Sequence, residues 1–237
     1  MPDSTAERRT TWVVAGVALV AIPLLYAVTL LDGDTVDWLI SEERPVELGG
    51  FFGLAACSVL CVLIWRTTTG WARLARLALL ALAVVFFFGA GEEISWGQRI
   101  FGFGTPEELA RVNIQGETNV HNLAFFEGEL DLDFLFQLFW LFLGVLIPLA
   151  ALWAPARERL KQLVPILPAP LAAAFVLNQI LTRATAELFD REPDLYTARD
   201  FTPAHSIFEI KETVVSLLLA AGFYLLYRHV RRTRPAL

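Results

Sequence analysis

The sequence predicts an all-α membrane protein, a polytopic bundle of six transmembrane helices with a long structured loop on one side. Hydrophobic residues make up 56% of the 237-residue chain, and the mean hydropathy of +0.54 is well above that of a soluble domain. The apolar residues fall in separate runs of about 20 residues, the length that a helix needs to cross a bilayer. Charged residues gather between these runs, and basic clusters alternate with acidic ones along the chain.

The predicted spans are the apolar runs that reach this length: residues 12–31, 46–65, 72–91, 134–153, 166–188 and 207–228. The first should be retained as a membrane helix, because its apolar core is longer than that of a secretory signal and no small-residue cleavage site follows it. A cleaved signal is the alternative. The fifth is crowded by Pro165, Pro168 and Pro170. Its helix should begin at Pro168 or Pro170, since proline is tolerated in a first turn.

The charges on the connections predict how the chain is oriented. Basic residues gather at the N-terminus, in the second and fourth connections and at the C-terminus, whereas the first, third and fifth connections are acidic. Because basic residues favour the cytoplasmic side, we expect a bacterial-type cytoplasmic membrane protein with both termini in the cytoplasm. His229, in the basic C-terminal tail, should be solvated. The net charge of -6 argues against a nucleic-acid partner, and the expected partner is the lipid bilayer.

The third connection, residues 92–130, is the longest and opens with two adjacent carboxylates, Glu92 and Glu93. The sequence Thr105-Pro106-Glu107-Glu108 predicts a short helix with a capping threonine and a proline in its first turn. This helix should run to about Asn113, and Gly116 should break it. Because long ordered loops tend to be functional, we expect a structured extracytoplasmic loop that covers the outer side.

Polar residues at helical spacing form stripes near the outer ends of three predicted helices. The stripes are Glu92, Ser95 or Trp96, and Arg99 on an extension of the third; Gln179, Arg183 and Glu187 on the fifth, with Asn178 and Thr182 beside them; and His205, Glu209, Glu212 and Ser216 on the sixth. Isolated charges in hydrocarbon are costly, so the stripes should face one polar cavity that opens outward. The alternative is a set of structural ion pairs, Glu92 with Arg99 and Arg183 with Glu187.

Two pairs of glutamate and histidine, each four residues apart, predict metal ligands on the outer side. On a helix, this spacing brings both side chains toward one point. Imidazole and carboxylate ligands together suit a divalent metal such as zinc, iron or manganese. The candidate ligands are Glu93, Glu117, His121, His205, Glu209 and Glu212. A haem held between His121 and His205 is an alternative.

A glutamate in a hydrophobic pocket can also act without a metal, as a general base on water. In that hypothesis Glu92 or Glu93 is the base, and Arg99 or a histidine stabilises the developing oxyanion. The candidate catalytic residues are therefore Glu92, Glu93, Arg99, His121 and His205.

The order of Glu92-Glu93, His121 and His205 across membrane helices resembles the CPBP family of intramembrane glutamate proteases, the group with the type II CAAX prenyl endopeptidases. The family signature has Glu-Glu and a nearby Arg, then Phe-x3-His, then His-x3-Asn. Here Arg99 lies six residues beyond Glu93, and glutamates stand at the Phe and Asn positions. The resemblance implies a membrane-embedded peptidase. The run GEEISWGQR is also similar to one found in uncharacterised bacterial integral membrane proteins, which implies no function.

The leading hypothesis for function is a membrane-embedded hydrolase whose Glu/His site opens to the extracytoplasmic side. Its substrate would be a lipid-like molecule or a membrane peptide, because the site would sit at the outer leaflet. One alternative is a cation or proton transporter or a channel subunit, although the nearly charge-free inner halves of the helices weigh against a pathway through the membrane. The other alternative is a non-catalytic membrane scaffold whose outer loop docks a partner.

Overall fold

The computed structural model describes residues 5–41, 44–113, 116, 118–119, 123 and 132–233. Regular structure in this part of the chain is helical apart from an isolated bridge between Asn113 and Leu123, which confirms the predicted all-α class. The helices are α1 (Thr5–Ala27), α2 (Gly33–Ile40), α3 (Pro45–Thr67), α4 (Arg73–Glu93), α5 (Gln98–Phe101), α6 (Glu107–Ala110), α8 (Leu132–Trp140), α9 (Ile147–Ala150), α10 (Ala154–Leu160), α11 (Ala172–Arg191) and α12 (Pro203–Thr233). Shorter segments are the 3-10 turns η1 (Val28–Leu30), η2 (Ser95–Gly97), η4 (Ala169–Leu171) and η5 (Pro193–Leu195), and the π-helical η3 (Leu141–Leu146).

Four helical stretches of the described chain are long and apolar enough to cross a membrane. They are Thr5–Leu30, Gly33–Thr67, Arg73–Glu93 and Pro203–Thr233. They correspond to the predicted first, second, third and sixth spans. Apolar helices of this length are typical of a multi-pass membrane protein.

The two remaining predicted spans have a different form. Residues 134–153 divide into α8, η3 and α9, and their apolar stretch, Phe134–Ala150, is shorter than the other candidates. The π-helical η3 ends at Leu146, two residues before Pro148, which has no N–H to donate to the preceding turn. In residues 166–188 the helix α11 begins only at Ala172, after η4, and its polar residues keep it outside the spanning candidates. The count of six spans therefore stays a prediction.

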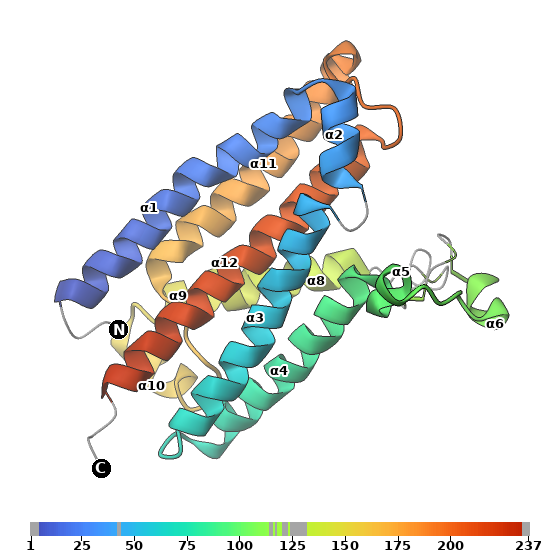
Figure 1. Cartoon of the computed structure of the whole chain (residues 1–237). Helices are drawn as coiled ribbons and strands as arrows, with labels where there is room; N and C mark the ends of the chain where they lie inside the picture. Colours follow the sequence, from blue (N-terminus) through green and yellow to red (C-terminus); the bar gives the residue numbers. More distant parts are fainter. Residues whose placement is uncertain are drawn as a thin grey trace.

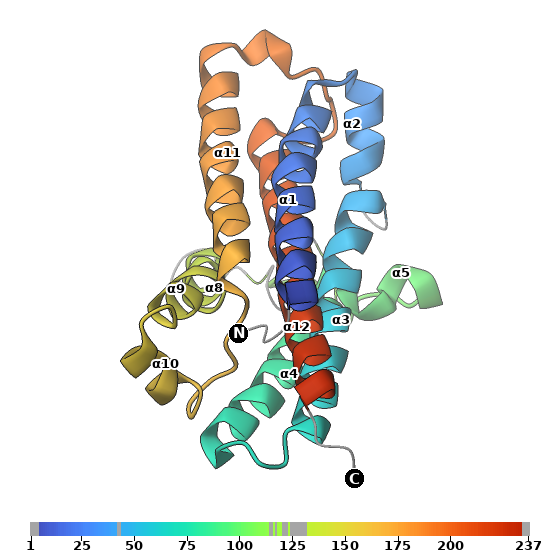
Figure 2. The same cartoon turned by 90° about the vertical axis from the view of Figure 1, so that its left-hand side faces the viewer.

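Helix α12 forms the centre of the bundle (Figure 1). It packs against α3, α11 and α1, and most of its residues from Ser206 to Leu226 are buried. Figure 2 shows α11 and α3 on opposite sides of α12. On the α4 side, the buried rings of Phe86 and Phe223 meet edge to face with their centroids 5.5 Å apart. The longest helix is therefore the one around which the apolar core is built.

Two glycines of α3 set how closely it approaches α12. A Cβ atom added to Gly49 would lie 2.8 Å from Cγ2 of Thr213, and one added to Gly53 would lie 2.8 Å from the backbone carbonyl carbon of Ser216. Small residues four positions apart allow the backbones of two membrane helices to pack closely. The close contact of α3 and α12 therefore depends on these glycines.

The connection between α1 and α3 contains a helix, α2, that the sequence analysis did not predict. Asp32 caps it by accepting hydrogen bonds from Oγ1 of Thr35 at 2.7 Å and from the Thr35 N–H at 3.1 Å, and these bonds hold the pKa of Asp32 below its usual range. Buried Asp37 accepts bonds from the backbone N–H groups of Arg199 and Asp200, at 2.9 and 3.2 Å. The acidic connection is thereby fastened to the segment that precedes α12.

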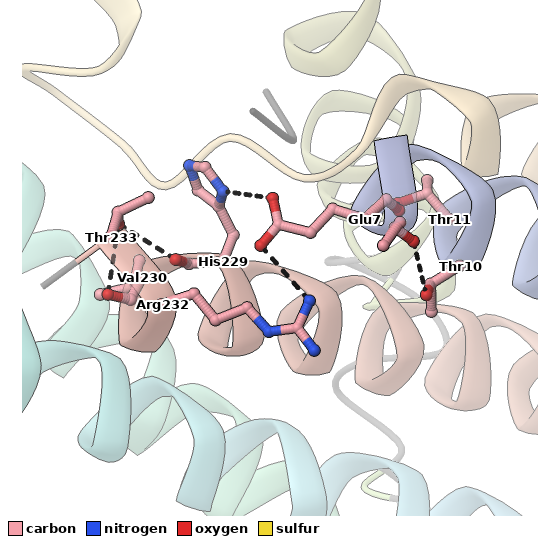
Figure 3. A network of polar contacts seen from close by, with 8 residues as sticks. Glu7, Thr10, Thr11, His229, Val230, Arg232 and Thr233 are labelled. Carbon is pink, nitrogen blue, oxygen red and sulfur yellow. Dashed lines mark hydrogen bonds and ion pairs between the residues drawn. The ribbon is translucent and has the colours of Figure 1, made fainter. Parts of the chain in front are cut away.

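At the opposite end of the bundle, the start of α1 contacts the end of α12 (Figure 3). Oε2 of Glu7 lies 3.2 Å from Nδ1 of His229, and Oε1 lies 3.8 Å from Nη1 of Arg232. The side chains of Glu7 and His229 are only 11% and 24% exposed. The prediction of a solvated His229 is therefore wrong, because α1 starts beside the last turns of α12 and supplies a carboxylate there.

The chain leaves α4 in a tight left-handed turn. Ser95, Trp96 and Gly97 have φ values of 45°, 55° and 77°, a region that costs non-glycine residues about 1–3 kcal/mol. The ring of Trp96 folds back onto Gly91, where an added Cβ would lie 2.9 Å from it. Helix α4 therefore ends at Glu93, and the predicted extension through Arg99, with its polar stripe, is wrong.

Replacing Gly97 with alanine should lower the free energy of unfolding by about 1–2 kcal/mol, because a Cβ atom disfavours the left-handed backbone. The added atom would also lie 2.8 Å from the ring of Phe101. Gly104→Ala is the matched control, since its Cβ would meet nothing within 4 Å and its φ is not left-handed. Thermal unfolding in detergent, followed by tryptophan fluorescence, compares the two variants. Equal melting temperatures would contradict the prediction.

The predicted helix after Thr105 is present but covers one turn, α6, before Gly116 reverses the chain with a φ of 70°. Pro106 rather than Thr105 stands at the cap position, and it offers no side-chain hydrogen bond. Oγ1 of Thr105 donates instead to the carbonyl of Gly116 at 2.8 Å. The threonine was therefore predicted in the wrong role, because it closes the loop rather than capping the helix.

Candidate functional site

Glu93, the last residue of α4, points into the junction of α3, α4 and α12. A Cβ atom added to Gly50 of α3 would lie 2.5 Å from Oε2 of Glu93, so the carboxyl group occupies the space that this glycine leaves. The same carboxyl group interacts electrostatically with those of Glu212, Glu209 and Glu47. We call Glu47, Glu93, Glu209 and Glu212 the carboxyl cluster.

Local sequence explains how the helices bring these acids together. Glu47 lies in the first turn of α3, after Pro45, where the positive end of the helix dipole favours a carboxylate. Helix α12 starts at the same end of the bundle (Figure 1), and the N–H of His205 in its first turn donates to Oγ1 of Thr202 at 3.2 Å. Glu209 and Glu212 are three residues apart and share a face of α12. That face is turned toward α3 and α4.

His205 lies beside the carboxyl cluster, nearer the start of α12. Its Nε2 atom is 3.9 Å from Oε1 of Glu209, and its side chain is 34% exposed. The imidazole stacks on the ring of Phe201, with centroids 4.9 Å apart and planes at 13°. The predicted pairing of His205 with Glu209 is therefore present, and it links an accessible imidazole to the cluster.

Glu92 has a different neighbourhood from Glu93, as adjacent residues on a helix do. One of its carboxylate oxygens accepts a hydrogen bond from Nε1 of Trp96 at 2.6 Å. The Trp96 ring in turn meets Phe87 and Phe88 edge to face, with centroids 6.0 and 5.3 Å away. Glu92 thus holds the turn that follows α4, whereas Glu93 belongs to the carboxyl cluster.

Two other polar residues of the GEEISWGQR run anchor the third connection. The side-chain amide of Asn119 donates to Oγ of buried Ser95 at 3.2 Å, and it receives a bond from the Asn113 amide at 2.8 Å. Oε1 of Gln98 accepts a bond from the N–H of Thr118 at 2.7 Å. Sequence reasoning did not assign these anchors, although polar residues at an expected helix end were a signal. The strained turn and the loop therefore form one unit next to Glu93.

The polar residues of α11 do not join this region. Asn178 and Thr182 bond the hydroxyl of Tyr26 at 2.9 and 2.6 Å, and the Asn178 amide donates to the backbone carbonyl of Lys211. Arg183 is exposed, and Glu187 pairs with Arg191 rather than with Arg183. The prediction of one cavity lined by three stripes is therefore wrong for α11, because its polar face packs on α1 and α12 or points outward.

The positions of the predicted metal ligands are described for only some of them. Glu117 and His121 lie outside the described residues. Of the other candidate ligands, the structure brings Glu93, Glu209, Glu212 and His205 into one neighbourhood. Within the described ranges, no three or more His, Cys, Asp or Glu side chains are arranged to hold a metal ion. The metal and haem hypotheses stay predictions.

Glu47 is the member of the cluster that the sequence analysis missed as a site residue. It belongs to the charges that make the first connection acidic, although it falls inside the apolar run 46–65. An ionisable residue within a predicted span is itself a signal of function. The structure shows that it is buried and lies within electrostatic range of Glu93.

Comparisons with protein-family models, with curated proteins and with solved structures found no match to this chain. The resemblance to the intramembrane glutamate proteases therefore stays a prediction, and the functional argument rests on the geometry of the carboxyl cluster and of the turn beside it.

Proposed function

We propose that the protein is a membrane-embedded hydrolase in which Glu93 is the general base. The observation that supports this most is the carboxyl cluster, because Glu93 lies at the junction of three apolar helices, within electrostatic range of Glu212, Glu209 and Glu47. Ionisable residues at such positions are costly, and by default they are functional. The strained turn directly after Glu93 adds support, because backbone strain gathers at active sites.

In this proposal Glu93 takes a proton from a water molecule, and the water oxygen attacks the electrophilic carbon of a lipid-like or membrane-peptide substrate. Glu209 or Glu212, in its protonated form, gives a proton to the leaving group. Closely spaced carboxyl groups suit this division of roles, because neighbouring like charges favour one protonated and one ionised partner. Arg99, His121 or His205 would stabilise the oxyanion, and a divalent metal, if bound, would polarise the same oxygen.

The proposal includes six spans in a bacterial-type cell membrane, with both termini in the cytoplasm. Helix α11 supports the count, since it runs beside α1 despite its polarity (Figure 1). The alternation of basic and acidic connections supports the orientation. In this topology the carboxyl cluster opens to the extracytoplasmic side, and the contact of Glu7 with His229 lies at the cytoplasmic side.

The test is hydrolysis in water labelled with heavy oxygen. Purified protein is incubated with a total membrane lipid extract, or with a library of membrane peptides, and the products are analysed by mass spectrometry. We expect label from water in a product formed by the wild type and a loss of about a hundredfold or more in Glu93→Gln. No labelled product from either substrate class, or an unchanged amount from Glu93→Gln, would contradict the proposal.

A second candidate, a proton or cation carrier, is favoured by one feature of the cluster. Carboxyl groups within electrostatic range of one another, as those of the cluster are, bind a proton or a cation more readily than isolated ones do. Proteoliposomes loaded with a pH-sensitive dye distinguish the two functions. A proton flux that Glu93→Gln abolishes would favour the carrier, whereas labelled product without a flux would favour the hydrolase.

A further inference from the structure

A pocket of about 490 Å³ lies at the end of the bundle that carries Glu7 and His229, away from the carboxyl cluster. It is formed by the first turns of α1, the α3–α4 turn, α10 with the extended segment after it, and the last turns of α12. Pockets that hold small molecules usually have volumes of about 300–1,000 Å³. This pocket is within that range, and it is assembled from segments far apart in the sequence.

The polar part of the pocket is basic. Arg157, Lys161, Arg228 and His229 line it, and among the described lining residues the acid is Glu7. Glu7 already contacts His229 at 3.2 Å and Arg232 at 3.8 Å (Figure 3). Three basic side chains besides His229 therefore line a pocket whose acid already contacts Arg232 and His229, and this charge balance favours an anionic ligand.

Arg157 is held in place before any ligand arrives. Its Nε atom donates to the carbonyl of Ala151 at 2.7 Å, and Nη2 donates to that of Leu152 at 3.3 Å. A guanidinium has more N–H groups than these two bonds use. A fixed arginine loses little conformational freedom on binding, and its planar fork matches phosphate oxygens.

The rest of the pocket is apolar. Its lining includes Pro148, Leu167, Leu225 and Leu226, and the last two are buried on the central helix. A small hydrophilic anion would leave these side chains without contacts. A ligand with an anionic head and an apolar tail would use both parts.

We propose that this pocket binds an anionic lipid, with its phosphate group at the basic side chains and the start of an acyl chain against the apolar wall. Basic pockets between membrane helices are suited to phosphate-bearing head groups. The proposal does not rest on the hydrolase function, because it concerns the other end of the bundle.

The experiment measures binding of short-chain phosphatidic acid, below its micelle concentration, to the full chain in a neutral detergent. Arg228→Gln and Lys161→Gln should each weaken binding by about tenfold, since each removes a charge-assisted contact. Arg231→Gln and Arg159→Gln are matched controls, because they remove the same charge from neighbouring exposed residues that do not line the pocket. Their affinity should stay within about twofold of the wild type.

Two further ligands show how much the charged head and the apolar tail of phosphatidic acid each contribute to binding. Short-chain phosphatidylcholine, which has no net charge, and inorganic phosphate, which has no tail, should each bind at least about tenfold more weakly than phosphatidic acid. Equal binding of phosphate would overturn the role of the apolar wall, and equal binding of phosphatidylcholine would overturn the role of the cations. Equal losses in pocket and control variants, or no binding by the wild type, would overturn the proposal. Lys161 is half-exposed and pairs with Glu158, so its variant tests binding in a chain whose core is unchanged.

Discussion

Gly53→Val should lower the free energy of unfolding by about 3 kcal/mol and separate α3 from α12. An added Cβ at this position would lie 2.8 Å from the backbone carbonyl carbon of Ser216 and 3.0 Å from the backbone nitrogen of Leu217. A side chain could rotate away from such a contact, but helical backbone cannot. The two helices would have to move apart, and the carboxyl cluster, with members on both, would lose its geometry.

Gly16→Val in α1 is the matched control, because a Cβ there meets nothing within 4 Å. Its free energy of unfolding should change by less than about 0.5 kcal/mol. Unfolding in detergent micelles, followed by tryptophan fluorescence, gives both values. The close packing of α3 on α12 would be refuted if Gly53→Val proved as stable as Gly16→Val.

Glu93→Gln should abolish activity and at the same time raise the free energy of unfolding by about 0.5–2 kcal/mol. The amide keeps the size of the side chain beside Gly50, and it cannot carry the negative charge that burial and the carboxyl groups of Glu212, Glu209 and Glu47 disfavour at this position. A variant that is inactive but more stable indicates a functional residue, because residues needed for activity often lower the stability of the fold. A structural role for Glu93, in which its carboxyl group makes contacts that an amide cannot replace, predicts the opposite, a loss of stability.

Two further variants with glutamate replaced by glutamine serve as controls for this experiment. Glu108→Gln changes an exposed residue of α6 and should alter neither stability nor activity. Glu92→Gln keeps an oxygen that can accept the bond from Trp96, so its stability should stay close to that of the wild type. If Glu92→Gln rather than Glu93→Gln raised the stability, the two neighbours would have been assigned the wrong roles.

Much of the fold could be predicted because a membrane helix is recognised from the hydropathy and length of one continuous segment. The stretches now seen as Thr5–Leu30, Arg73–Glu93 and Pro203–Thr233 follow from hydropathy and length alone. The same reasoning did not predict that the run around Pro148 divides into α8, η3 and α9, because hydropathy does not register that proline cannot complete a regular α-helix. It also extended the third helix through Trp96, because hydropathy and helical spacing do not reveal a left-handed turn. The tryptophan ring stabilises this turn by folding back onto Gly91.

By itself, the sequence determined that this is an all-α protein with membrane-length apolar helices, and that its ionisable residues gather at the helix ends. Only the tertiary structure decided which of those residues meet. Glu93 comes within electrostatic range of Glu47 and Glu212 because Gly50 leaves room for its carboxyl group and Gly53 lets α3 approach α12. His229 meets Glu7 because α1 starts where α12 ends. Composition and spacing are properties of each segment alone. The rotation and approach of helices depend on packing between residues far apart in the sequence, such as Gly50 with Glu93 and Gly53 with Ser216.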